Sequence, residues 1–403
     1  MTDATTGEVA RLNHDEATVR RARNAVFLVF AASGLAFSSL ASRLPDVKRI
    51  LDLTPGELGT TLLAGALGAV IGLPVSGRLI ERFGTRATVR VGALGATLGL
   101  VVAGLCVDMF HSRPLLMAAL FVTSLGIGVW DVSMNHEGPV VERGLGRAIM
   151  PWFHAFFSGA TVLAALFGSL MTALGVPVWL HLIGMALVAA ASVWVGTASF
   201  FPDEPAEDET AGSKSAPRGT SAWLEPRTLL VGLVVLVAAF TEGTANDWVA
   251  VAMTEGHHLP AWAGVLGFAV FLGAMTAGRI LGTAALDRYG RVLVLRLLFV
   301  LAFAGSLLVV FGGPFVAFFG AALWGLGASL GFPVGMSAAA DDPARAAARL
   351  SVVSTIGYLA FLAGPPLLGY LGDHVGVLHA LLAVGALLVP ALLALPAVRE
   401  PKN

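Results

Sequence analysis

Ionisable side chains are rare in the apolar stretches of this sequence, and the first that could do chemistry lie in GVWDVSMNHEG. Asp131 and Asn135 are four residues apart there, which places both on one face of a helix. A carboxyl group in apolar surroundings can take up and release a proton, so we expect Asp131 to couple proton movement and Asn135 to bind solute. The alternative is a structural carboxylate bonded to a neighbouring helix.

A second polar group lies in FTEGTANDW, where Glu242 and Asn246 again stand four residues apart and Asp247 follows. Glu242 is the second candidate for proton coupling. Asn246 and Asp247 are candidate substrate ligands, although Asp247 could also be a solvated residue at the mouth of the site. Trp248 could stack on a substrate or anchor the helix at an interface.

Two cationic side chains complete the candidate site. His154 begins the stretch HAFFSG, at a depth expected to match Asp131, and an imidazole near an acid is a workable proton partner. Its alternative role is to cap carbonyl groups. Arg43 could hold an anionic or hydroxylated solute, pair with Asp247 to close an outer gate, or extend to lipid headgroups. No spacing of His, Cys and Asp indicates a metal site.

The elements that carry these residues are strongly apolar. Of the 403 residues, 56% are hydrophobic and 13% charged, and mean hydropathy is +0.81, which excludes a soluble globule. A net charge of −1 gives no surface for nucleic acid. The only cysteine is Cys106, so no internal disulfide forms. No phosphate-binding loop and no hydrolase motif stand out, so we expect neither an enzyme nor a cofactor.

Twelve stretches are long enough to cross a hydrocarbon core of about 30 Å as helices. Lys and Arg concentrate on one side of this arrangement, and only four of the 25 fall on the other, which predicts that both termini lie in the cytoplasm. The predicted spans are 24–43, 57–77, 88–108, 114–136, 151–174, 177–200, 228–253, 261–284, 292–312, 315–336, 350–371 and 377–397.

The spans fall into two similar groups of six. A polar segment rich in Pro, Ser, Gly and acids divides them and cannot bury enough apolar surface to fold. GRLIERFGTR in the first group has its echo in GRILGTAALDRYGR in the second, an internal repeat of about 200 residues of the kind found in transporters. The expected organisation is a tail (1–23), a first half (24–200), a linker (201–226), a second half (227–397) and a short tail (398–403).

These two loops resemble the Gly-x-x-x-Asp-Arg-x-Gly-Arg signature of the major facilitator superfamily, and the resemblance covers nearly the whole chain. It implies an all-α membrane fold of twelve helices in two pseudo-symmetric halves, with helices 1, 4, 7 and 10 around a central cavity. It also implies an inner gate, in which loop charges hold the halves together while the pore faces out. Those charges are Glu81, Arg82, Arg86, Asp287, Arg288 and Arg291, and their alternative role is membrane topology alone, through the positive-inside rule.

Within the superfamily, Asp131 and Asn135 resemble the acid and amide of L-fucose-permease-type proton symporters, but the acid of their first helix has no counterpart here. SRLP (42–45), HAFFSG (154–159) and TEGTANDW (241–248) resemble the MosC-like bacterial branch. This predicts a monomeric secondary transporter in the plasma membrane that moves a sugar, polyol or amino-inositol with protons. The alternatives are a drug/proton antiporter and a membrane sensor.

Overall fold

The computed structural model describes residues 16–147, 149–202 and 221–400, and these are helical, without strands. Most of the predicted linker and most of the first tail lie outside the described residues. The helices are α1 (Glu16–Ala41), α2 (Leu44–Ile50), α3 (Pro55–Leu105), η1 (Cys106–Phe110), α4 (Arg113–Leu145), α5 (Met150–Ala173), α6 (Val178–Thr197), η2 (Ala222–Leu224), α7 (Pro226–Gly256), α8 (Ala261–Tyr289), α9 (Arg291–Phe311), α10 (Pro314–Ala328), α11 (Gly331–Ala339), α12 (Ala346–Val375), α13 (Val377–Ala380), α14 (Leu382–Ala394) and η3 (Leu395–Val398).

Eleven stretches of the described residues are long and apolar enough to cross a membrane, which approximately confirms the predicted twelve. The difference lies in the stretch Pro55–Phe110, whose 56 residues form one helical run. At 1.5 Å per residue it exceeds twice the thickness of a hydrocarbon core. It therefore holds two of the predicted spans, 57–77 and 88–108.

The chain folds back between these two spans at Gly84. This residue has φ 79° and ψ 167°, a conformation that Gly adopts without the steric penalty of a Cβ atom. Gly68 before the bend and Gly92 after it both pack against the backbone of α4, at Phe121 and at Trp130. Since both arms of α3 meet the same helix, α3 is a hairpin.

The two halves repeat this local geometry. Gly290, between α8 and α9, has φ 77° and ψ 162°, nearly the conformation of Gly84. Gly305 on α9 packs against the backbone of Trp324, as Gly92 packs against Trp130. Small residues at these positions let helix backbones approach closely. The internal repeat expected from the loop motifs thus extends to helix packing.

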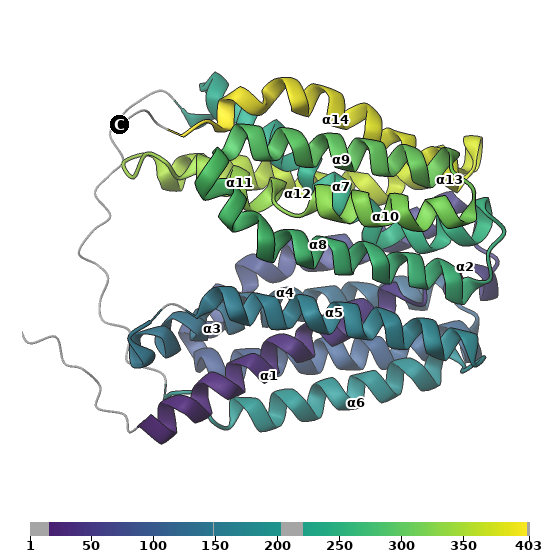
Figure 1. Ribbon diagram of the computed structural model, residues 1–403. Helices are drawn as coiled ribbons and strands as arrows, with labels where there is room; N and C mark the ends of the chain where they lie inside the picture. The colour runs from purple at the N-terminus through teal and green to yellow at the C-terminus, as the bar shows by residue number, and fades with distance from the viewer. Residues whose placement is uncertain (1–15, 148, 203–220, 401–403) are drawn as a thin grey trace, which may run out of the picture.

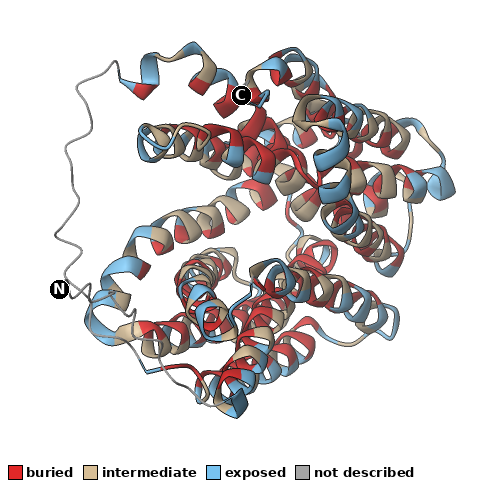
Figure 2. Ribbon diagram, turned by 60° about the vertical axis from the view of Figure 1, so that its left-hand side comes forward, coloured by how far each residue is buried: buried red, intermediate tan, exposed pale blue. Residues whose placement is uncertain are grey.

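The helices form two bundles, shown in Figure 1 in purple to teal (α1 to α6) and green to yellow (α7 to α14). Figure 2 shows that burial concentrates on the helix faces that meet inside each bundle. The most extensive contacts between the bundles are those of α3 with α12 and of α5 with α8, and α2 also contacts α7 and α8. We call the "outer end" the end of the bundles with the connections at 51–54, 174–177 and 257–260, and the "inner end" the opposite one, which holds Gly84 and Gly290.

Candidate functional site

The bundles are tied together at the outer end. Lys48 of α2 forms an ion pair of 2.6 Å with Glu255 of α7. The backbone N–H of Gly56 donates to Asp373 Oδ1 at 2.9 Å. The Ser169 hydroxyl donates to the carbonyl oxygen of Trp262 at 2.8 Å. Each of these contacts links one bundle to the other, so the outer end is closed.

At the inner end, the six predicted gate charges do not bridge the bundles within the described part of the chain. Arg86 donates to the carbonyl oxygen of Phe200 at 2.7 Å, inside the first bundle. Arg291 pairs with Asp341 at 2.8 Å, inside the second. The other four are exposed: Glu81, Arg82, Asp287 and Arg288. The structure is therefore a conformation closed at the outer end, whereas the predicted gate is expected to form only in the opposite conformation.

Asp247 lines a cavity of about 190 Å³ between the bundles, and it is the only ionisable side chain there among the described residues. It accepts no hydrogen bond and forms no ion pair with any described residue. Asp247 itself is half-buried. The other lining residues are Ala36, Phe37, Leu40, Ala41, Leu44, Leu62, Gly65, Ala66, Ala69, Leu120, Thr123, Ser124, Ile127, Phe361 and Pro365.

Asp131 and Asn135 lie on one face of α4, as their spacing predicts. The Asn135 amide donates to the Asp131 backbone carbonyl at 2.9 Å and more weakly to its carboxylate, at 3.4 Å. Asp131 forms no ion pair with a described residue and is half-buried. The neutral amide of Asn135 is therefore the hydrogen-bond partner that the described residues give the Asp131 carboxylate.

Glu242 has a partner that the sequence analysis missed. One nitrogen of Arg279, on α8, donates to both Glu242 carboxylate oxygens at 2.9 Å. Arg279 also donates to the carbonyl oxygen of Ser329 at 3.3 Å, where the tenth predicted span breaks into α10 and α11. The sequence signal that could have revealed this partner is Arg279 itself, a single guanidinium five residues before the end of the predicted span 261–284.

His154 lies near the inner end rather than beside Asp131. It is four residues from the start of α5, about 6 Å along the axis, whereas Asp131 is about 21 Å from the end of α4. The prediction of equal depth failed because α4 continues to Leu145. The His154 ring lies edge-on to Phe30 of α1, with the ring centroids 5.3 Å apart.

Arg43 does not pair with Asp247. Its side chain is 1% exposed and binds Asp46 at 3.3 Å, together with Thr172 and the carbonyl oxygen of Val176. Three partners inside the first bundle consume most of its hydrogen-bonding capacity. Arg43 is absent from the lining of the Asp247 cavity, and burial also excludes the lipid-headgroup alternative in this conformation.

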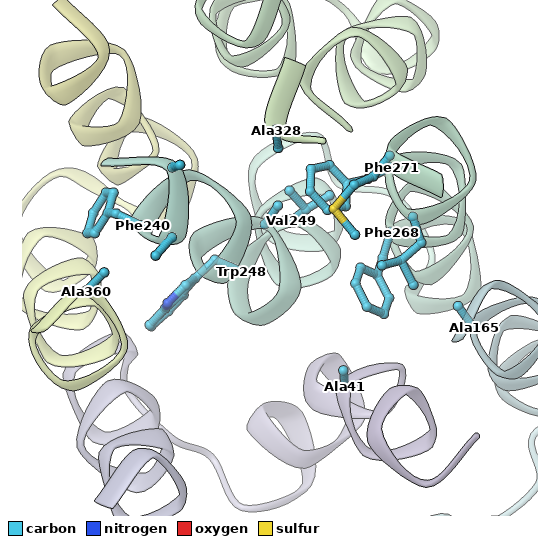
Figure 3. Close-up of a cluster of buried hydrophobic side chains, with 14 of the residues drawn as sticks. Ala41, Ala165, Phe240, Trp248, Val249, Phe268, Phe271, Ala328 and Ala360 are labelled. Atoms are coloured by element: carbon cyan, nitrogen blue, oxygen red, sulfur yellow. The ribbon is translucent and has the colours of Figure 1, made fainter. Parts of the chain in front are cut away.

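Asn246 and Trp248, which flank Asp247, each have a buried polar atom without a hydrogen-bond partner among the described residues: the amide oxygen of Asn246 and the indole N–H of Trp248. Trp248 is 1% exposed, so it does not anchor the helix at a membrane surface. Figure 3 shows it on α7, in the buried cluster that includes Phe240 and Ala360. Buried polar atoms are normally paired, so these two are exceptions, and neither residue lines the Asp247 cavity.

Comparison with known proteins identifies relatives along most of the chain. The sequence profile of the Major Facilitator Superfamily matches residues 26–316. The membrane protein MosC of Rhizobium meliloti is 28% identical over 372 residues, 91% of this chain and 88% of MosC. This match and the profile confirm the resemblance expected from the sequence.

Solved structures share the fold. The nucleoside transporter NupG superposes with a TM-score of 0.77 at 14% identity, covering 94% of this chain and 99% of NupG. The fucose:proton symporter FucP of E. coli gives a TM-score of 0.62 at 16% identity, covering 94% of this chain and 98% of FucP. At this identity the likeness establishes the architecture alone.

Proposed function

The chain belongs to the Major Facilitator Superfamily and is a multi-pass membrane transporter, and we propose that it carries a small polar solute in company with protons. The proposed solute is a sugar, a polyol or an amino-inositol. Transport proceeds by alternating access, in which the two bundles rock about a central site. The proposed orientation places both termini in the cytoplasm of a bacterium, and the proposed working unit is a monomer.

The observation that carries this proposal is Asp247, an acid without a partner in a cavity between the bundles. A carboxylate in so apolar a cavity is stable only if a proton neutralises it or a bound solute supplies a donor or a cation. Ser124, on α4 of the first bundle, adds a hydroxyl group to the opposite wall, and Thr123 beside it has a hydroxyl that donates to the carbonyl oxygen of Ala119 at 2.8 Å. A solute with several hydroxyl groups matches this set.

The three candidate acids differ in their partners. Glu242 is bound by Arg279, so its charge is already balanced. Asp131 has only a neutral amide beside it. Because an acid that exchanges protons must be able to exist in both charge states, we assign the coupling role to Asp131 and Asp247. Glu242 then positions α7 against α8 and the break after α10.

Uptake into proteoliposomes tests the proposal. Purified protein is reconstituted, and radiolabelled inositols, amino-inositols, hexoses and a nucleoside are offered with and without an imposed pH gradient. We expect one of the first three classes to accumulate above its outside concentration only when the gradient is present. Accumulation that does not depend on the gradient would refute proton coupling, and accumulation of none of these classes would refute the proposed solute.

One observation favours a second candidate, a drug/proton antiporter. Most residues around Asp247 are apolar, and an apolar cavity with one acid also suits an amphipathic cation. The same proteoliposomes distinguish the two functions, because an antiporter moves its solute against the direction of proton flow. Gradient-driven transport of a lipophilic cation with no polyol transport would establish this alternative.

A further inference from the structure

We propose that a crevice at the inner end of the first bundle binds the phosphate group of an anionic phospholipid, whose acyl chain lies along α5. The crevice has a volume of about 330 Å³ and lies where the start of α1 meets the connection into α5. It is lined by Arg23, Phe27, Arg147, Ile149 and Trp152. This site is separate from the cavity of Asp247, and the proposal does not depend on which solute is carried.

Among the described residues, the charge of the crevice is positive and unbalanced. Arg23 donates to the neutral side-chain amide of Asn24, and neither Arg23 nor Arg147 pairs with an acid of the described chain. The nearby acid Glu142 is already engaged, because it accepts hydrogen bonds from the backbone N–H groups of Ile149 and Met150. Two guanidinium groups without acidic partners are well suited to a phosphate, which they can bind in bidentate fashion.

The crevice opens toward lipid rather than toward the transport pathway. Trp152 is 65% exposed, and Phe156, Leu163 and Leu170, which follow it on α5, are between 50% and 64% exposed. At 100° per residue these four side chains lie within about 40° of one another around the helix axis. His154 on the same helix projects from nearly the opposite side. The exposed apolar stripe therefore continues from the crevice along the lipid-facing side of α5.

The arrangement matches the shape of a phospholipid. Cations bind the phosphate, Trp152 lies at the level of the headgroups as interfacial tryptophans do, and the apolar stripe accepts the acyl chain. A free phosphate ion would use the two arginines but would leave the stripe without a role. We therefore assign the site to a lipid and treat inorganic phosphate as the competing source of the same chemistry.

Native mass spectrometry of the full chain in detergent provides the test. The protein is titrated with dioleoylphosphatidylglycerol, with dioleoylphosphatidylcholine and with inorganic phosphate. The variant Arg23→Gln/Arg147→Gln is compared with Arg21→Gln/Arg143→Gln, which removes two exposed arginines from the same end without touching the crevice. If the first variant does not fold, Arg147→Gln alone still tests the site, because it changes a single residue on an exposed loop.

We expect the parent and the Arg21/Arg143 variant to retain one phosphatidylglycerol with equal affinity. The Arg23/Arg147 variant should bind it about tenfold or more weakly, and Arg147→Gln should show an intermediate loss. An equal loss of phosphatidylglycerol affinity in both double variants would mean that the lipid is attracted by positive charge in general, and it would overturn the site. Equal binding of phosphatidylcholine, or displacement of the lipid by millimolar phosphate, would overturn the assignment to an anionic lipid.

Discussion

Both carboxylate oxygens of Glu242 accept hydrogen bonds from a single nitrogen of Arg279, each at 2.9 Å. The pair joins α7 to α8, and Arg279 continues the link to the carbonyl oxygen of Ser329 at the break between α10 and α11. Three segments of the second bundle therefore depend on one guanidinium group.

Arg279→Gln should destabilise the protein more than Glu242→Gln does. The arginine change leaves a carboxylate unpaired and half-buried, and the expected loss is about 1 to 3 kcal/mol. The double variant Glu242→Gln/Arg279→Gln should regain part of this loss, because no charge then remains without a partner. Thermal unfolding in detergent measures all three. A double variant as unstable as Arg279→Gln would show that the pair is not the source of the effect.

Asp131→Asn should abolish accumulation driven by a pH gradient and leave solute exchange across the membrane partly intact. A neutral side chain at this position lets the loaded carrier reorient, but it can no longer take up a proton. The measurement is a comparison of accumulation with counterflow in the same proteoliposomes. Asp131 is not a coupling residue if the variant accumulates solute as the parent does.

Lys48→Gln should increase access from the outer end, because it removes the ion pair with Glu255 that links α2 to α7. A partly exposed pair contributes about 0.2 to 1 kcal/mol, so outward-facing molecules should become roughly 1.4-fold to fivefold more frequent. The measurement is the labelling rate of a single cysteine placed at Leu62, in the cavity, in a protein whose own Cys106 has first been replaced by Ser. The control is Arg49→Gln, whose partner Asp46 lies in the same bundle. Equal labelling in both variants would contradict the outer closure.

Glu81→Ala should shift the carrier further toward the conformation seen here, and Glu81→Asp should be tolerated. The carboxylate is exposed in this structure and is expected to hold the inner ends together only when the outer end opens. Its removal should disfavour the outward-facing state by about 1 to 3 kcal/mol. The labelling rates of cysteines placed at the outer and the inner end measure the change. If these rates are unaltered in Glu81→Ala, the six inner charges serve membrane topology alone.

Glu225, just before α7, should make the stability of the folded protein depend on pH in the acidic range. Burial raises its pKa, but hydrogen bonds from Thr228 and Arg349 and the charges of Arg349 and Arg345 outweigh that effect, so the pKa lies below its ordinary value. The resulting stabilisation is present above the unfolded value of about 4.3 and disappears as pH falls through the folded one. Glu225→Gln should reduce the loss of thermal stability on acidification below about pH 4.5. An unchanged pH profile would contradict this.

The sequence predicts the helices well because each apolar span is recognisable by itself. The predicted span 261–284 begins with α8 at Ala261, and the four-residue spacing of Asp131 and Asn135 correctly places them on one face of α4. Such features depend on neighbours within a few residues. The repeated glycine conformation at Gly84 and Gly290 likewise follows from two local motifs.

The pairings between helices could not be predicted in the same way. Glu242 and Arg279 are 37 residues apart, and Arg43 meets Thr172 across 129 residues. Which helix faces meet depends on how whole bundles pack, and no local pattern encodes it. For the same reason the sequence suggested Asp247 as the partner of Arg43, whereas the folded chain supplies Asp46.

The central claim is that Asp247 couples solute movement to protons, and proton movement itself tests it most directly. Lightly buffered proteoliposomes receive the solute identified by the uptake screen, and the external pH is recorded for the parent, for Asp247→Asn and for Asp52→Asn, a control on an exposed turn. We predict a solute-dependent pH change in the parent and the control, and none in Asp247→Asn. A pH change of parental size in Asp247→Asn would contradict the claim.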